Sequence, residues 1–177
     1  MAEEKKEPWL NYLALSTIIF AVAATLSTFK GGGFSTRSVL SQEQASNKWA
    51  YYQSKSLKSY LYETQKDMLE LTTKRMQKNE AEVIAAYQKK MAYYDQSVKR
   101  YEKEKSEIKK DAEQFEKLRD EAQKHSQAFG MAVIFLQICI LLSSIAALIK
   151  RKYLWYMAMA VGVVGLLYFA NGFLLFL

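Results

Sequence analysis

Side chains able to perform nucleophilic or acid–base chemistry are scarce and scattered in this sequence. It contains one histidine, His125, and one cysteine, Cys139, which lies inside a long apolar run. A metal site or a nucleophile and its base needs several such groups close together. Residues 31–33 are glycines, but they lack the flanking pattern of a phosphate-binding loop. We therefore expect no enzyme activity and no catalytic, cofactor-binding or metal site.

The densest pattern that could bind something interleaves aromatic and cationic side chains over residues 44–58, QASNKWAYYQSKSLK. One interpretation is a binding face for anionic headgroups or a protein partner. The other is that Trp49 and Tyr52 pack against a returning helix near Phe115 and Leu118. The candidate interaction residues are Lys48, Trp49, Tyr51, Tyr52 and Lys55.

The charge is distributed unevenly along the chain. Half of the residues are apolar and the net charge is +7, which alone would suit a soluble basic domain. Residues 9–29 and 128–177, however, are nearly uncharged apart from one basic triplet, whereas residues 35–127 are densely charged and contain no glycine or proline. A bilayer imposes such segregation. Because the charges of the middle region are mixed in sign, we expect no nucleic-acid partner.

Three apolar runs are long enough to cross a membrane. The first, residues 9–29, would span roughly 31 Å as a helix, which matches the hydrocarbon core of a bilayer. We predict an all-α integral membrane protein with three transmembrane helices and a long extramembrane antiparallel coiled-coil hairpin. The predicted parts are a tail at 1–8, transmembrane helices at 9–29, 128–149 and 153–177, a Gly-rich joint at 30–34, the hairpin domain at 35–127 with its turn near 77–82, and a basic turn at 150–152.

The first apolar run has a competing interpretation as a cleaved signal peptide. Lys5 and Lys6 precede it, and residues 21–23 resemble a small-residue cleavage site. The apolar stretch continues beyond that site, and the preceding segment is also acidic, so a membrane span is the favoured interpretation.

The basic triplet Lys150, Arg151 and Lys152 determines the expected orientation. Short basic loops stay in the cytoplasm, whereas long domains cross largely regardless of charge. Three spans then place the N-terminus in the cytoplasm, and the hairpin domain and the C-terminus on the other side. Basic residues near the membrane on that other side, such as Lys30 and Arg37, weaken the charge difference.

The middle region has the composition of continuous helix. One helix of that length would extend about 140 Å, whereas two antiparallel arms would return the chain to its entry point. Heptad spacing favours the hairpin, because the register breaks between Leu71 and Ile84, near the middle of the region. The seam predicted for the first arm is Leu57, Leu61, Thr64, Met68 and Leu71. The seam predicted for the second arm is Ile84, Tyr87, Met91, Tyr94, Val98, Tyr101, Ile108, Ala112, Phe115 and Ala122, with Lys105 and Arg119 as exceptions.

Polar and small residues inside the predicted spans indicate helix contacts. Gln137, Ser143 and Ser144 are candidate intramembrane polar contacts, because polar groups in lipid face other protein or a water-filled path. Ala158 and Gly162, with Gly165 nearby, form a small-residue pattern that allows close helix packing.

A resemblance to a known family covers nearly the whole chain. It rests on the segment around Trp49, in the form AS-x-x-WAYYQ-x-K, and on the spans flanking KRKYLWY. The sequence resembles the bacterial membrane proteins of domain-of-unknown-function family 4337. The resemblance implies the bacterial inner membrane and brings no reaction, cofactor or catalytic residue. Many similar proteins have a longer His-rich N-terminal tail, which is missing here, so no metal role is carried over.

Two functions are consistent with these patterns. The first is a non-enzymatic inner-membrane scaffold or accessory protein, anchored and oligomerised by its spans, whose helical hairpin binds protein. The alternative is a homo-oligomeric membrane pore lined by Gln137, Ser143 and Ser144. The expected partners are membrane lipids and either further copies of the chain or another membrane protein.

Overall fold

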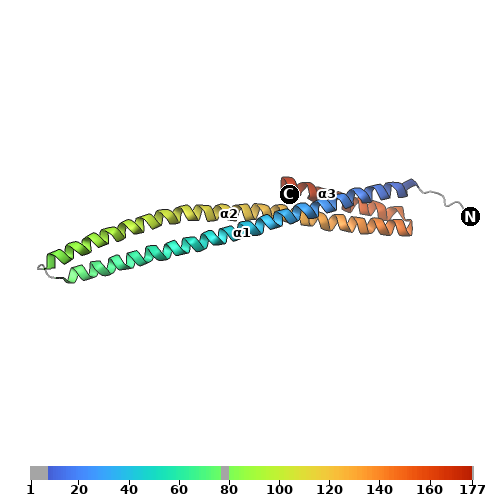
Figure 1. The fold of residues 1–177 in the computed structure, drawn as a ribbon. Helices are drawn as coiled ribbons and strands as arrows, with labels where there is room; N and C mark the ends of the chain where they lie inside the picture. Colours follow the sequence, from blue (N-terminus) through green and yellow to red (C-terminus); the bar gives the residue numbers. More distant parts are fainter. Residues whose placement is uncertain (1–7, 77–79, 177) are drawn as a thin grey trace, which may run out of the picture. The chain divides into compact units, whose positions relative to one another are not determined.

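The structure, a computed structural model, describes residues 8–76 and 80–176 and consists of three helices. Helix α1 covers Pro8–Arg75, α2 covers Ala81–Ile149 and α3 covers Lys152–Leu174 (Figure 1). Each contains a stretch long and apolar enough to cross a membrane. The all-helical fold predicted from the sequence is confirmed. Of the turn predicted near 77–82, residues 77–79 lie outside the described residues, and α2 begins at Ala81.

The described residues form two compact units. Residues 8–40 and 118–176, called the bundle below, contain the first part of α1, the last part of α2 and all of α3. Residues 41–76 and 80–117, called the hairpin below, contain the remaining parts of α1 and α2.

Small residues let the three helices of the bundle approach closely. A methyl group added at Gly162 would lie 2.5 Å from the Phe20 ring and 2.8 Å from Cys139 Sγ. One added at Gly165 would lie 2.8 Å from Leu136 Cγ. The resulting core consists of buried residues: Phe20, Ala23, Ala24, Ala132, Leu136, Cys139 and Ala158. Such packing is expected when helices associate in lipid. The hydrophobic effect does not drive helices together there, and small residues allow the close van der Waals contact that does.

The two ends of the bundle are fixed by aromatic side chains and hydrogen bonds. At one end the Trp9 and Trp155 rings lie 6.2 Å apart, and Trp155 Nε1 donates to Ser16 Oγ at 3.2 Å. At the other end His125 stacks on Phe34 with centroids 4.5 Å apart. Residues near the start of α1 and the start of α3 therefore lie at the same end of the bundle.

The predicted Gly-rich joint at residues 30–34 was wrong, because α1 continues through it without a break. Glycine is unfavourable in a helix interior by about 1 kcal/mol relative to alanine, which does not suffice to end a long helix that is held by packing. Gly31 has a packing role: an added methyl group would lie 3.0 Å from Phe129 Cβ, and its carbonyl accepts a hydrogen bond from Ser126 Oγ.

In the hairpin, α1 and α2 run antiparallel, as residue pairing shows. Ion pairs join Lys48 to Asp111, Lys55 to Glu104 and Lys66 to Asp95, at 2.7, 2.6 and 2.7 Å. Residue numbers therefore rise along α1 as they fall along α2, and the segments lie side by side in Figure 1. The antiparallel hairpin is confirmed over the single continuous helix.

The seam predicted for the second arm was correct, and the one predicted for the first arm was wrong. All ten predicted residues of α2 are buried or half-buried, whereas all five predicted residues of α1 are exposed. The α1 face that contacts α2 is instead marked by buried and half-buried positions that repeat at alternating three- and four-residue steps: Ala45, Lys48, Tyr52, Lys55, Ser59, Tyr62, Lys66, Leu69 and Thr73. Lysines can occupy this face because their aliphatic stems pack while their ammonium groups reach carboxylates on α2.

Candidate interaction sites

The aromatic and cationic segment of α1 mostly contacts α2 within the hairpin. Lys48 pairs with Asp111, and Trp49 Nε1 donates to Glu116 Oε1 at 2.8 Å. The Trp49 ring also packs edge-on against Tyr52, whose ring lies 5.5 Å from Lys105 Nζ.

Lys55 is the most constrained cation of this segment. Its ammonium group lies 2.6 Å from Glu104 Oε2 and within 5.3 Å of the Tyr51 and Tyr101 ring centres. Tyr51 itself is half exposed. The interpretation as packing against the returning helix therefore accounts for Lys48, Trp49, Tyr52 and Lys55, and it leaves Tyr51 at the surface.

The three cross-helix ion pairs have the same polarity: in each of them the cation comes from α1 and the carboxylate from α2. Between the Lys55 and Lys66 pairs, Ser59 Oγ donates to Glu102 Oε1 at 3.0 Å. Farther along, the Tyr62 ring packs on Tyr93, Tyr94 and Tyr101. We call these ion pairs and hydrogen bonds the cross-helix ladder. Opposite charges at matching heights specify which residues of the two arms face each other, even though each exposed pair stabilises little.

The ladder shifts the pKa values of its members in the expected directions. Hydrogen bonds from Lys66 and Lys99 lower the pKa of Asp95 to about 2. The hydrogen bond to Asp95 raises the pKa of Lys66, and the one to Glu104 raises the pKa of Lys55. The hydrogen bond from Lys55 in turn lowers the pKa of Glu104. All four groups are therefore charged at neutral pH, so the ladder is fully formed there.

The opposite face of α1 in the hairpin carries an exposed apolar row, which we call the outer stripe. It consists of Leu57, Leu61, Thr64, Met68 and Leu71, all of them exposed. These are the residues that the sequence predicted to form the contact within the hairpin. Their heptad spacing was the signal, and it does not reveal which helix covers them.

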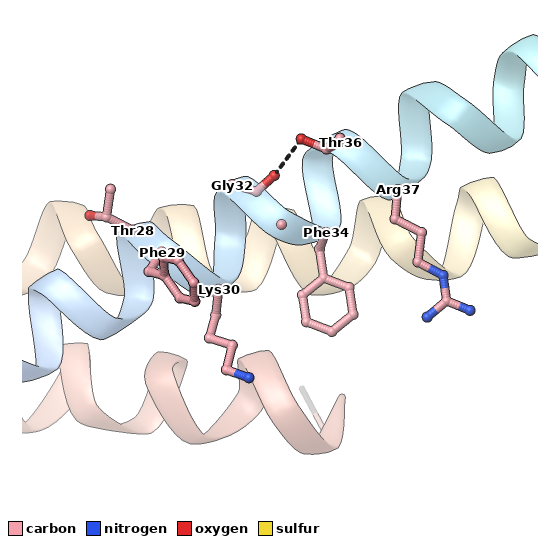
Figure 2. Close-up of a pocket in the computed structure, with 8 residues that line it drawn as sticks. Thr28, Phe29, Lys30, Gly32, Phe34, Thr36 and Arg37 are labelled. Carbon is pink, nitrogen blue, oxygen red and sulfur yellow. Dashed lines mark hydrogen bonds between the residues drawn. The ribbon is translucent and has the colours of Figure 1, made fainter.

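A shallow notch on α1 lies beside the glycines of the bundle (Figure 2). Lys30, Phe34 and Arg37 project from the same side of the helix and Phe29 also lines the notch, while Thr36 Oγ1 donates to the Gly32 carbonyl on the other side, at 3.1 Å. The glycines keep the floor of the notch open, since an added methyl group at Gly32 or Gly33 meets nothing within 4 Å. Two cations beside two aromatic rings suit an anionic headgroup above an acyl chain. The sequence analysis noted both cations only for their effect on orientation.

The three candidate intramembrane polar residues of α2 do not meet. Gln137 is exposed, and so is Ser144, whose hydroxyl donates to the Ile140 carbonyl at 2.9 Å. Ser143 is buried. Gln137 and Ser144 are seven residues apart and so share one face of α2, whereas Ser143 lies on another.

The small residues of α3 and the basic triplet have structural roles. Ala158, Gly162 and Gly165 are buried and form the contact face of α3. Lys150 and Arg151 make the turn between α2 and α3, and Lys152 is the first residue of α3. Lys150 adopts a left-handed conformation with φ of 53°, and Arg151 N donates to the Ala146 carbonyl at 3.2 Å.

His125 contributes to packing in the bundle. Its Nδ1 lies 2.8 Å from the carbonyl oxygen of Gly172 and fixes the end of α3 against α2. Within the described ranges 8–76 and 80–176, no group of three His, Cys, Asp or Glu side chains is arranged to hold a metal ion.

These features define a class of protein: an all-helical chain with three helices that could cross a membrane and a polar helical hairpin between the first two apolar stretches. The chain belongs to the family described as "Domain of unknown function (DUF4337)", whose sequence model matches residues 9–175. No curated protein and no solved structure matches the chain significantly.

Proposed function

We propose that this chain is a non-enzymatic scaffold or accessory protein of the bacterial inner membrane, anchored by three spans, whose helical hairpin binds protein on the far side of the membrane from the cytoplasm. The observation that carries the proposal is the outer stripe. Apolar side chains of a polar hairpin stay exposed there although a second helix of the same chain packs on α1. Contiguous exposed apolar surface marks interaction sites.

The proposed orientation rests on the basic turn and on the aromatic end of the bundle. Lys150, Arg151 and Lys152 would lie in the cytoplasm. The contact between Trp9 and Trp155 supports an N-terminus on the same side, because it brings the start of α1 and the start of α3 together. The hairpin then lies in the periplasm.

Labelling of single cysteines tests this orientation. In a Cys139→Ala background, Glu113→Cys in the hairpin should react with a membrane-impermeant maleimide in cells whose outer membrane is permeabilised. Arg151→Cys should react only after the inner membrane is opened. The reverse pattern would overturn the orientation, and recovery of the chain in the soluble fraction would overturn membrane anchoring.

A homo-oligomeric pore is the second candidate, and the exposure of Gln137 and Ser144 on one face of α2 supports it. In a ring of copies this face could line a common path. Ser143, buried within one copy, would not contribute. Ion flux through vesicles that contain the purified chain, abolished by Gln137→Leu, would support the pore; well-oriented vesicles without flux would exclude it.

A further inference from the structure

The outer stripe and the face of α1 that contacts α2 lie on opposite sides of the helix. An α-helix turns about 100° per residue, so Leu57, Leu61 and Met68 point roughly 180° away from Ser59, Tyr62 and Lys66. The exposed fractions agree: Leu57 is 60% exposed, Leu61 51%, Met68 64% and Leu71 58%. In the hairpin, α1 therefore has two faces with helical-contact spacing, and α2 covers only one of them.

The covered face is more polar, and the uncovered face more apolar, than is usual for a two-helix protein in water. The covered face contains Lys48, Lys55, Lys66, Ser59 and Thr73 beside Ala45, Tyr52, Tyr62 and Leu69, whereas the uncovered face contains three leucines, a methionine and Thr64. Leucine and methionine side chains that stay in water forgo the stabilisation that their burial would provide. A second helix against the outer stripe removes this inconsistency.

The spacing of the stripe defines the kind of surface that fits it. Its steps are 4, 3, 4 and 3 residues, which is the a and d pattern of a coiled coil with Leu61 and Met68 at a and Leu57, Thr64 and Leu71 at d. A helix with the same pattern interlocks with it, and the same stripe of another copy provides that pattern.

The residues flanking the stripe permit two copies to meet in parallel. In a parallel pair the g position of one helix faces the following e position of the other. Those pairs would be Gln53 with Lys58, Tyr60 with Gln65 and Asp67 with Thr72, so no like charges meet. Together with Tyr60, which is 64% exposed, the stripe would cover about 1,000 Å² over both copies, which is the lower limit for a specific interface.

We propose that two copies of this chain associate through the outer stripe, with their α1 helices parallel and in register. The parallel direction rests on the proposed function, because copies inserted in one membrane with one orientation present their hairpins in the same direction. Each copy then contributes its hairpin to a four-helix assembly, with the two α1 helices in the middle.

Site-specific crosslinking in native membranes tests the proposal. In the full chain with Cys139→Ala, Leu61→Cys should be converted to a covalent dimer by a short bis-maleimide, since a parallel in-register pair places residue 61 opposite itself. Glu63→Cys is the matched control, because it is exposed on the same arm and lies outside the stripe. Both positions are exposed, so neither substitution should disturb the hairpin.

A dimer formed by Leu61→Cys and not by Glu63→Cys is the expected result. Equal crosslinking at both positions, or none at position 61, would overturn the proposal. An adduct of a different mass would show that another protein occupies the stripe; the second copy would then be excluded while the scaffold function stood. Loss of the chain from alkali-washed membranes would instead refute the membrane-anchored function. The presence or absence of the dimer band would still show whether two copies associate.

Discussion

The bundle and the hairpin are built largely by the same two helices, yet those helices contact each other in different ways. In the bundle, contact depends on the absence of side chains: Gly162 and Gly165 leave room for Phe20 and Leu136. In the hairpin, it depends on long side chains that end in charges, such as Lys55 and Glu104. Bundle contacts should thus respond to added volume and hairpin contacts to changes of charge.

The membrane anchoring that we propose would account for this difference. Lysine and glutamate side chains in a bilayer would be desolvated at high cost, so close van der Waals contact would have to hold a bundle that crosses a membrane. In water, apolar and charged contacts are both available, and the charged ones select which residues face each other. The outer stripe does not follow this division, because it is apolar and lies in the hairpin.

The largest effect should come from filling the closest contact of the bundle. Gly162→Val places methyl groups against the Phe20 ring and Cys139 Sγ, and such overpacking destabilises by about 1–3 kcal/mol. We expect a lower temperature of thermal unfolding in detergent. Gly130→Val is the matched control, because an added methyl group at Gly130 meets nothing within 4 Å. Equal losses in both variants would contradict the packing of α3.

A charge reversal should weaken the hairpin without affecting the bundle. Lys55→Glu places a carboxylate against Glu104, so the arms should separate more readily and limited proteolysis within residues 41–117 should be faster. Glu104→Lys combined with Lys55→Glu restores opposite charges and should restore much of the protection. If the double variant is cleaved as fast as the single one, the pair does not contribute to alignment.

Removing the two cations at the notch should reduce binding of anionic lipid and leave folding unchanged. Each cation near a membrane surface contributes about 1 kcal/mol, or roughly fivefold in affinity. Lys30→Gln with Arg37→Gln should therefore retain less co-purifying anionic lipid, as measured by native mass spectrometry. Lys58→Gln with Lys74→Gln, a pair in the hairpin, is the control. Equal retention in both variants would exclude the notch.

The smallest effect should appear at low pH. The pKa of Asp95 is lowered to about 2 in the fold, below the value of about 3.9 for an unfolded aspartate. Its contribution to stability is therefore complete above pH 4 and lost as the pH falls from 4 through 2. Asp95→Asn should remove this part of the pH dependence of thermal unfolding, and an unchanged profile would refute the pairing with Lys66 and Lys99.

The sequence predicted the parts of the fold that depend on long-range pattern. The three helices with long apolar stretches, the antiparallel hairpin and the second seam were correct, because each rests on a pattern repeated over many residues and no single side chain decides it. The Gly-rich joint failed because glycine weakens a helix only slightly, and packing such as that of Gly31 on Phe129 determines whether the helix continues.

The first seam failed for a different reason. Apolar spacing predicts that a face is covered but does not identify the covering helix. The face that α2 covers contains Lys48, Lys55 and Lys66, whose partners lie 29 to 63 residues away in sequence. Spacing along one helix contains no information about pairs between distant residues. The exposed position of Gln137 could not be predicted either, because it too depends on which helices pack against α2.

The complete burial of Cys139 beside Gly162 gives the chain an intrinsic probe of its own opening. The only thiol of the sequence becomes reactive when α3 moves away from α2. The rate at which an alkylating reagent modifies the unaltered protein therefore measures how often the three helices separate. The same rate can be followed without heat or denaturants.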